Sequence, residues 1–213
     1  MHEYQHLLHC CREREQEEHR RGFETGTIVM ARFTKLMEHN FLPMFQQMAW
    51  EHSQKVKTAV SIDEFDESHH HFVEGLRQGI KARNGTVVSY GEAQQPVNIF
   101  LKEYVEKSGI LPEPDSQRLI PFLHVTLDGV IIMYLRSLFR MDYLRHVVPG
   151  GETADPIPFE REEVNPANLR QLLSFDREHY RAWQGWFRRI SPGRPVLLDS
   201  IWSISRQTLL GQV

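Results

Sequence analysis

The chain has 213 residues, of which 40% are hydrophobic and 25% charged, so it can bury a sizeable core and does not belong to the disordered class. Its formal net charge of −3, with histidine neutral, excludes a nucleic-acid protein that relies on a strongly basic overall field. Binding of that kind would need a local basic patch.

Cysteine usage and hydropathy indicate the compartment. Cys10 and Cys11 are neighbours, so they cannot build a disulfide framework, and this favours a reducing environment. The first twenty residues are crowded with Glu, Arg and His and lack the pattern of a secretory signal. The nearly uncharged run over 125–135 is too short to span a bilayer. We therefore expect a cytoplasmic protein without a membrane segment, and no motif calls for a cofactor.

Helical spacing of apolar residues predicts an all-α fold, with seven or eight helices in a single globular domain over residues 1–213. Residues 1–22 are expected to form a peripheral N-terminal helix. The segments with a helical pattern, among them one short piece at 117–123, cover residues 2–20, 27–39, 43–56, 62–83, 96–108, 117–123, the later part of 124–140, 166–189 and 196–210. Residues 111–116 and 148–165, rich in Pro and Gly, are expected to be loops.

Capping signals set several of these boundaries. Ser61 and Glu64, in "SIDE", predict a capping box, and the dipeptide 84–85 (Asn-Gly) predicts the end of the same helix. In "SYGEAQQPVNIFLK", Pro96 fits a first helical position and Gln95 the cap before it. Free amides after that cap would point outward, which is an anion-binding geometry.

Metal chemistry is not expected. "HEYQH" at residues 2–6 matches the zinc motif H-E-x-x-H, but no structure precedes it to form a cleft, and a polar helix explains the same residues. Three further histidines, 69–71, point to different faces of one helix and so cannot meet at a single ion.

Arg140 and His146, in "RMDYLRH", resemble the R-x(4–6)-H signature of HEPN ribonucleases. The resemblance implies a dimer in which a helical Arg and His promote attack by a ribose hydroxyl. Arg14 with His19 fits the pattern equally well. The alternative is that Arg140, Arg145 and His146 complement a helix dipole.

Two blocks carry a second resemblance. "YGEAQQPVNIFLKEY" and "HVTLDGVIIMYLR" contain G-x-A-Q-x-x-x-N-x-x-L-K and H-x-x-L-D, and they resemble an uncharacterised bacterial helical family and, more distantly, helix-hairpin-helix DNA glycosylases. This implies DNA as partner, Gly91 as the hairpin glycine, Gln95 at the position of the catalytic lysine and Asp128 as the aspartate that activates water or stabilises the sugar cation. Glutamine cannot form a Schiff base, so the implied enzyme uses water or is an inactive relative.

Further DNA contacts are predicted for Lys102, two helical turns after Gln95, and for Arg188 and Arg189 in "HYRAWQGWFRR". Trp183 and Phe187 of that helix share its apolar spacing, and we expect both in the core.

Two hypotheses of different class follow. In the first, the chain is a DNA-binding, glycosylase-like protein with Asp128 in an open cleft. In the second, it is a non-enzymatic interaction protein, of the kind found in phages and mobile elements, in which a buried polar network fixes helix register. That network would contain Gln94, Asn98, His124 and Asp128, and Asp128 would also suit a helix cap. The sequence leaves the oligomeric state open.

Overall fold

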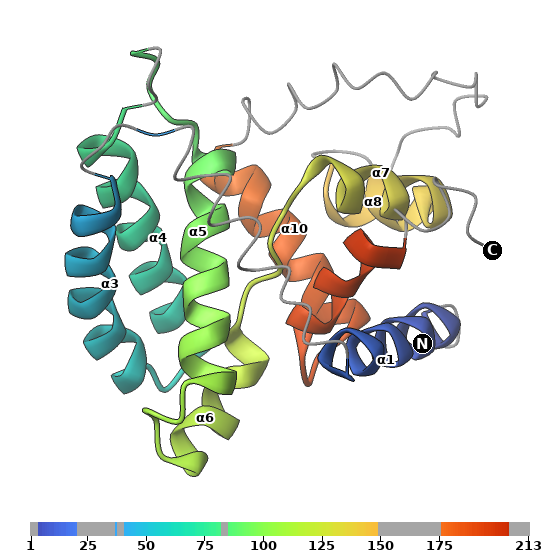
Figure 1. Cartoon of the computed structure of the whole chain (residues 1–213). Coiled ribbons are helices and arrows are strands. Elements are labelled where there is room, and N and C mark those ends of the chain that lie inside the picture. Colours follow the sequence, from blue (N-terminus) through green and yellow to red (C-terminus); the bar gives the residue numbers. More distant parts are fainter. Residues whose placement is uncertain (1–3, 21–36, 38–40, 82–84, 149–175, 205–213) are drawn as a thin grey trace.

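The computed structural model describes residues 4–20, 37, 41–81, 85–148 and 176–204. These residues fold into one body of helices, which confirms the predicted all-α class (Figure 1). An isolated antiparallel bridge joins the extended backbone at Lys81 and Val87. No helix in this part of the chain is long and apolar enough to cross a bilayer.

In chain order the helices are α1 (Gln5–Arg20), α3 (Phe41–Thr58), α4 (Ile62–Gly79), α5 (Tyr90–Lys102), the π-helix η1 (Glu103–Lys107), α6 (Glu113–Leu119), the 3-10 helix η2 (Ile120–Phe122), α7 (Gly129–Leu138), α8 (Arg140–His146), α10 (Arg177–Ile190) and the 3-10 helix η5 (Pro195–Ser200). Helices α3, α4 and α5 pack against one another on one side of the molecule, and α7, α8 and α1 lie on the other side of α10 (Figure 1). The segment between η2 and α7 runs through the middle.

Two glycines allow α3 and α4 to approach closely. A Cβ added at Gly75 would lie 2.7 Å from Cε of Met48, and one at Gly79 would lie 2.9 Å from Sδ of Met44. The methionine side chains of α3 therefore occupy the space that larger residues on α4 would fill.

The apolar face of α10 forms the centre of the core. Trp183 and Phe187 are buried, as their spacing predicts, and so are Tyr180 and Trp186.

Helix α1 is also anchored, because Leu7 and Cys11 are buried. Burial raises the pKa of Cys11 to about 12, so its thiol stays protonated.

Capping side chains explain where two helices begin, and the start of α4 at Ile62 confirms the prediction, whereas the start of α10 at Arg177 was not predicted. Ser61 caps α4 and its Oγ accepts a hydrogen bond from the Glu64 amide at 3.3 Å. Helix α10 begins at Arg177 because Asp176 caps it, with Oδ1 accepting from the His179 amide at 2.8 Å. The helix expected over 27–39, the irregular stretch 148–165 and the predicted start at 166 fall almost entirely outside the described residues.

Other predicted boundaries are wrong. Helix α4 ends at Gly79 rather than 83, and α3 begins at Phe41. Residues 113–116, expected in a loop, form the first part of α6, because Pro114 lies in the first turn, where proline costs no hydrogen bond. The last expected helix starts as the 3-10 helix η5, and α-helical hydrogen bonding follows over 201–204.

Candidate functional site

Helix α5 begins six residues before the predicted first turn. Ser89 caps it: Ser89 Oγ accepts from the Glu92 amide at 3.2 Å, and the Glu92 carboxylate accepts from the Ser89 amide at 2.9 Å. This capping box satisfies the amides of Ser89 and Glu92. Pro96 therefore lies inside α5, and the prediction that Gln95 caps a helix with free amides is wrong.

The two glutamines of this helix bind the backbone of the segment that precedes α7. Gln94 Nε2 donates to the carbonyl of Leu127 at 2.8 Å and to that of Gly91 at 2.8 Å. Gln95 Nε2 reaches the same Leu127 carbonyl at 3.2 Å. The Gln94 side chain is fully buried, so these bonds hold α5 against the segment.

Asn98, one turn further along α5, is the centre of the buried network. Its Nδ2 donates to Gln94 Oε1 at 2.7 Å and to the Val125 carbonyl at 3.0 Å, and lies 2.9 Å from the Tyr180 hydroxyl. Its Oδ1 is 2.6 Å from His69 Nε2. Because an amide oxygen only accepts, Nε2 of His69 carries a proton.

His124 extends the network toward the surface. Its Nε2 lies 2.8 Å from Asp66 Oδ1, and its Nδ1 lies 2.9 Å from the Tyr180 hydroxyl. The same aspartate accepts from both terminal nitrogens of Arg188, at 2.6 and 3.0 Å. The network thus runs from an ion pair to two adjoining imidazoles, because the ring centroids of His69 and His124 lie 4.1 Å apart with the ring planes tilted by 50°.

Burial decides the charge states in this network. Burial lowers the pKa of His69 well below its ordinary value, and it lowers the pKa of His124 although Asp66 opposes the change. Burial would raise the pKa of Asp66, but its hydrogen bonds and charge contacts with His124 and Arg188 outweigh this and hold that pKa well below its usual range. Two neutral imidazoles therefore lie beside one Asp–Arg ion pair.

The network donates hydrogen bonds to a buried stretch of irregular backbone. Four of the residues 123–127 are buried, yet the stretch belongs to no helix or sheet. Gln184 of α10 accepts from the Val125 amide and donates to the Val125 carbonyl, both at 2.9 Å, and Asp199 accepts from the Thr126 amide at 2.8 Å. Side chains thus supply the hydrogen bonds that secondary structure supplies elsewhere.

Asp128 ends this stretch as the N-cap of α7. Its Oδ1 accepts from the Ile131 amide at 2.8 Å, which confirms the cap interpretation. Of the predicted network, Gln94, Asn98 and His124 are joined by hydrogen bonds. A catalytic role for Asp128 stays a prediction.

The positive charges predicted to bind DNA are mostly paired inside the protein. Lys102 Nζ lies 3.1 Å from Asp199 Oδ2 and its side chain is 18% exposed. Arg188, 14% exposed, pairs with Asp66 and donates to the Phe122 carbonyl at 2.9 Å. Gly91 is buried in the first turn of α5, whereas Arg189 is exposed at the end of α10. The structure gathers Gln95, Lys102 and Arg188 around the buried stretch, and DNA contacts by these residues stay predictions.

The other candidate motifs are not assembled in this chain alone. Arg140 and His146 stand at opposite ends of α8, and a HEPN site, still a prediction, would require a second chain. Residues 2 and 3 of "HEYQH" lie outside the described residues, and within the described ones no group of three or more His, Cys, Asp or Glu could hold a metal. His69, His70 and His71 contact Asn98, Tyr90 and the Glu67 carbonyl respectively, as expected for different helix faces.

Sequence reasoning missed Asp66, Tyr180 and Gln184. One signal was available for α4: His69 lies on the same stripe as Phe65 and Phe72, so a polar residue interrupts an apolar face. Such an interruption indicates a buried partner. No comparable local signal marks Gln184.

The chain matches no family model, no curated protein and no solved structure.

Proposed function

We propose that this chain is a non-enzymatic helical interaction protein, built around a buried polar network that fixes the register of α4, α5 and α10. The observation that carries the proposal is the enclosure of the network. Gln94, Asn98 and His124 are buried, and their hydrogen bonds go to neighbouring side chains and to the backbone of 123–127. A buried network whose members hydrogen-bond one another specifies packing rather than chemistry on a substrate.

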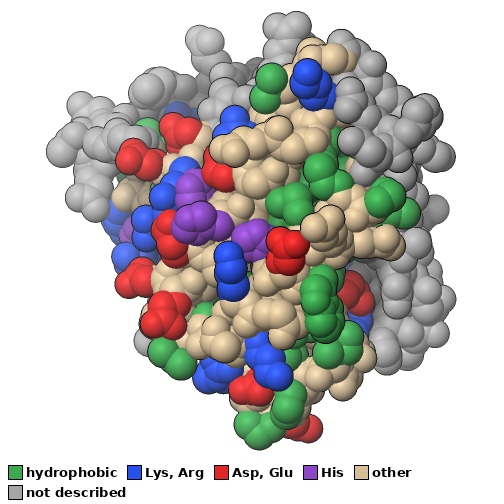
Figure 2. Space-filling view, turned by 90° about the vertical axis from the view of Figure 1, so that its left-hand side faces the viewer, with side chains coloured by type: hydrophobic (Ala, Val, Ile, Leu, Met, Phe, Trp, Pro, Cys, Tyr) green, Lys and Arg blue, Asp and Glu red, His purple; other side chains and the backbone are tan. Residues whose placement is uncertain are grey.

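The exposed surface of α3 supports the proposal that this protein binds a partner. Trp50 is 66% exposed, and Leu42 lies two turns before it on the same helix. Val60 and Ile62, at the junction of α3 and α4, are also exposed. Figure 2 shows the α3 side of the molecule, where hydrophobic side chains lie beside charged residues and histidines. An exposed tryptophan, on a helix that exposes a second large apolar side chain, supports a protein-binding surface on α3.

A site-specific crosslink tests the proposed surface. A photoreactive amino acid at position 50, expressed in the native host, should give one dominant protein adduct. The matched control is the same group at Lys107, an exposed residue of η1. Equal, diffuse labelling from both positions would contradict a binding surface on α3.

The competing hypothesis, a glycosylase-like DNA-binding protein, has its own experiment. Purified protein is titrated against labelled single- and double-stranded DNA with normal, abasic or oxidised sites across a salt series. We expect no lesion preference, because Lys102 and Arg188 are already paired with carboxylates. Salt-sensitive, lesion-preferring binding would overturn the interaction-protein proposal in favour of DNA.

A further inference from the structure

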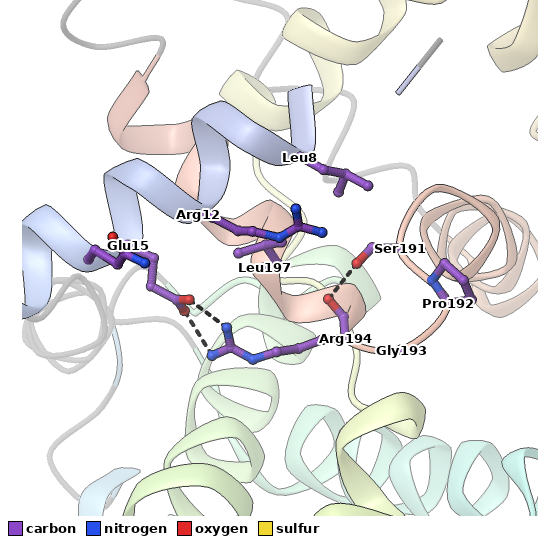
Figure 3. Close-up of a pocket in the computed structure, with 9 residues that line it drawn as sticks. Leu8, Arg12, Glu15, Ser191, Pro192, Gly193, Arg194 and Leu197 are labelled. Carbon is purple, nitrogen blue, oxygen red and sulfur yellow. Dashed lines mark hydrogen bonds and ion pairs between the residues drawn. The ribbon is translucent and has the colours of Figure 1, made fainter. Parts of the chain in front are cut away.

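A pocket separates α1 from the turn that follows α10. Its volume is about 530 Å³, within the range of small-molecule sites. One wall is a single face of α1, and the other is formed by residues 191–194 and Leu197. Figure 3 shows the Arg12 side chain extending from α1 into the space between Leu8 and Ser191.

The far side of the pocket is held by ion pairs that engage four of the five N–H groups of Arg194. Arg194 donates to Glu15 through its two terminal nitrogens and to Glu106 through Nε and Nη2, at 2.7 and 3.0 Å. Ser191 Oγ donates to the Arg194 carbonyl at 2.8 Å, which closes the turn. These contacts fix the turn after α10, so this wall of the pocket is formed before any ligand binds.

Arg12 differs from Arg194 in this respect. Its side chain lines the pocket and is exposed, and among the described residues its guanidinium has no hydrogen-bond or ion-pair partner. Leu8, Pro192 and Leu197 supply apolar surface around it. The pocket therefore combines one free planar cation with a hydrophobic lining.

We propose that this pocket binds a small monocarboxylate with an apolar body. A guanidinium matches a carboxylate through two parallel hydrogen bonds, which a single arginine can supply. Glu15 lines the pocket three residues after Arg12, so a second negative charge on the ligand would lie near this carboxylate and be disfavoured. The apolar body lies against the leucines and Pro192.

Calorimetric titration of the full chain with octanoate tests this site. Octanoate should bind saturably at one site, and octylammonium, which has the same chain and the opposite charge, should not. Arg12→Gln should weaken binding by roughly tenfold, since it removes charge-assisted hydrogen bonds. The matched control is Arg181→Gln, which removes another exposed arginine. Its Nη2 lies 4.0 Å from Asp63 Oδ1, so its ion pair is a loose one.

Arg12 is exposed, so the Arg12→Gln variant should fold, and circular dichroism checks that it does. The octyl phosphate dianion should bind more weakly than octanoate. Absence of saturable octanoate binding, equal affinity in the Arg12→Gln variant, or tighter binding of octyl phosphate would each overturn the proposal.

Discussion

The side-chain amide of Gln184 pairs with both backbone polar groups of Val125, at 2.9 Å in each direction. The backbone of Val125 has no neighbouring strand or helical turn to bond. The Gln184 side chain supplies the two hydrogen bonds instead. The same replacement recurs along the stretch 123–128, where Gln94, Asn98 and Asp199 each bond a backbone group.

Removing the Gln184 amide while keeping its shape should therefore be costly. In Gln184→Met the buried Val125 amide loses its partner, and we expect the free energy of unfolding to fall by about 2 kcal/mol. Urea denaturation measures the change. The matched control is Gln47→Met, an exposed residue bonded to Glu51 at 3.2 Å, which should change stability by less than about 0.5 kcal/mol. Equal losses in both variants would contradict the role assigned to Gln184.

Neutralising Asp66 should destabilise the fold more strongly. Asp66→Asn leaves Arg188 mostly buried without its counter-charge, and the expected loss in the free energy of unfolding is about 3 kcal/mol. Asp63→Asn serves as control, because Asp63 is exposed and lies 4.0 Å from Arg181. A loss at Asp66 no greater than at Asp63 would show that the ion pair is dispensable.

Substitution of Asp128 by asparagine distinguishes the interaction-protein hypothesis from the DNA glycosylase hypothesis. Asparagine also caps helices, so Asp128→Asn should lower the free energy of unfolding by at most about 1 kcal/mol. Under the interaction-protein proposal the variant also keeps its crosslink at position 50. If the protein releases bases from DNA, and Asp128→Asn abolishes this in a folded variant, Asp128 is catalytic.

Stability should decrease as pH falls below about 6.5, the ordinary histidine value. His69 and His124 have lowered pKa values in the fold, so in this range the unfolded state binds more protons, and falling pH favours unfolding. Each contributes a slope of about 1.4 kcal/mol per pH unit until it protonates in the fold. His52, His70 and His179 shift in the same direction. Because the pKa of Asp66 is also lowered, further loss follows below its ordinary value of 3.8.

Urea denaturation at a series of pH values measures this slope. His69→Gln should reduce it by about one proton equivalent, and His9→Gln, which removes an exposed histidine of α1, is the matched control. A free energy of unfolding that stays constant between pH 7 and pH 5 would show that the buried imidazoles are not held neutral.

Local chemistry in the sequence was enough for the helical class, the Ser61 cap and the Asp128 cap, because each depends on residues within one helical turn. The start of α5 was equally readable, since "SYGE" repeats the S-x-x-E spacing of "SIDE". A proline usually marks the first turn of a helix, so Pro96 predicts a later start, whereas α5 accommodates this proline in its interior.

The rest of the network depends on distant pairs. His124 bonds Asp66 and Tyr180, which lie more than fifty residues away on either side, and no periodicity brings them together. Apolar periodicity also gives no reason to expect buried, irregular backbone at 123–127. The role of the polar residues on α5 and α10, which is to bond that backbone, can be recognised only when the position of the backbone is known.

Hydrogen exchange at Val125 and Thr126 tests the central claim most directly. If side chains of α5, α10 and η5 hold this stretch, both amides should exchange only through global unfolding, with the protection of core helix amides. In Gln184→Met, protection at Val125 should fall below that of the helices. Rapid exchange of these two amides in the unaltered protein, at the rate of an exposed loop, would contradict the account.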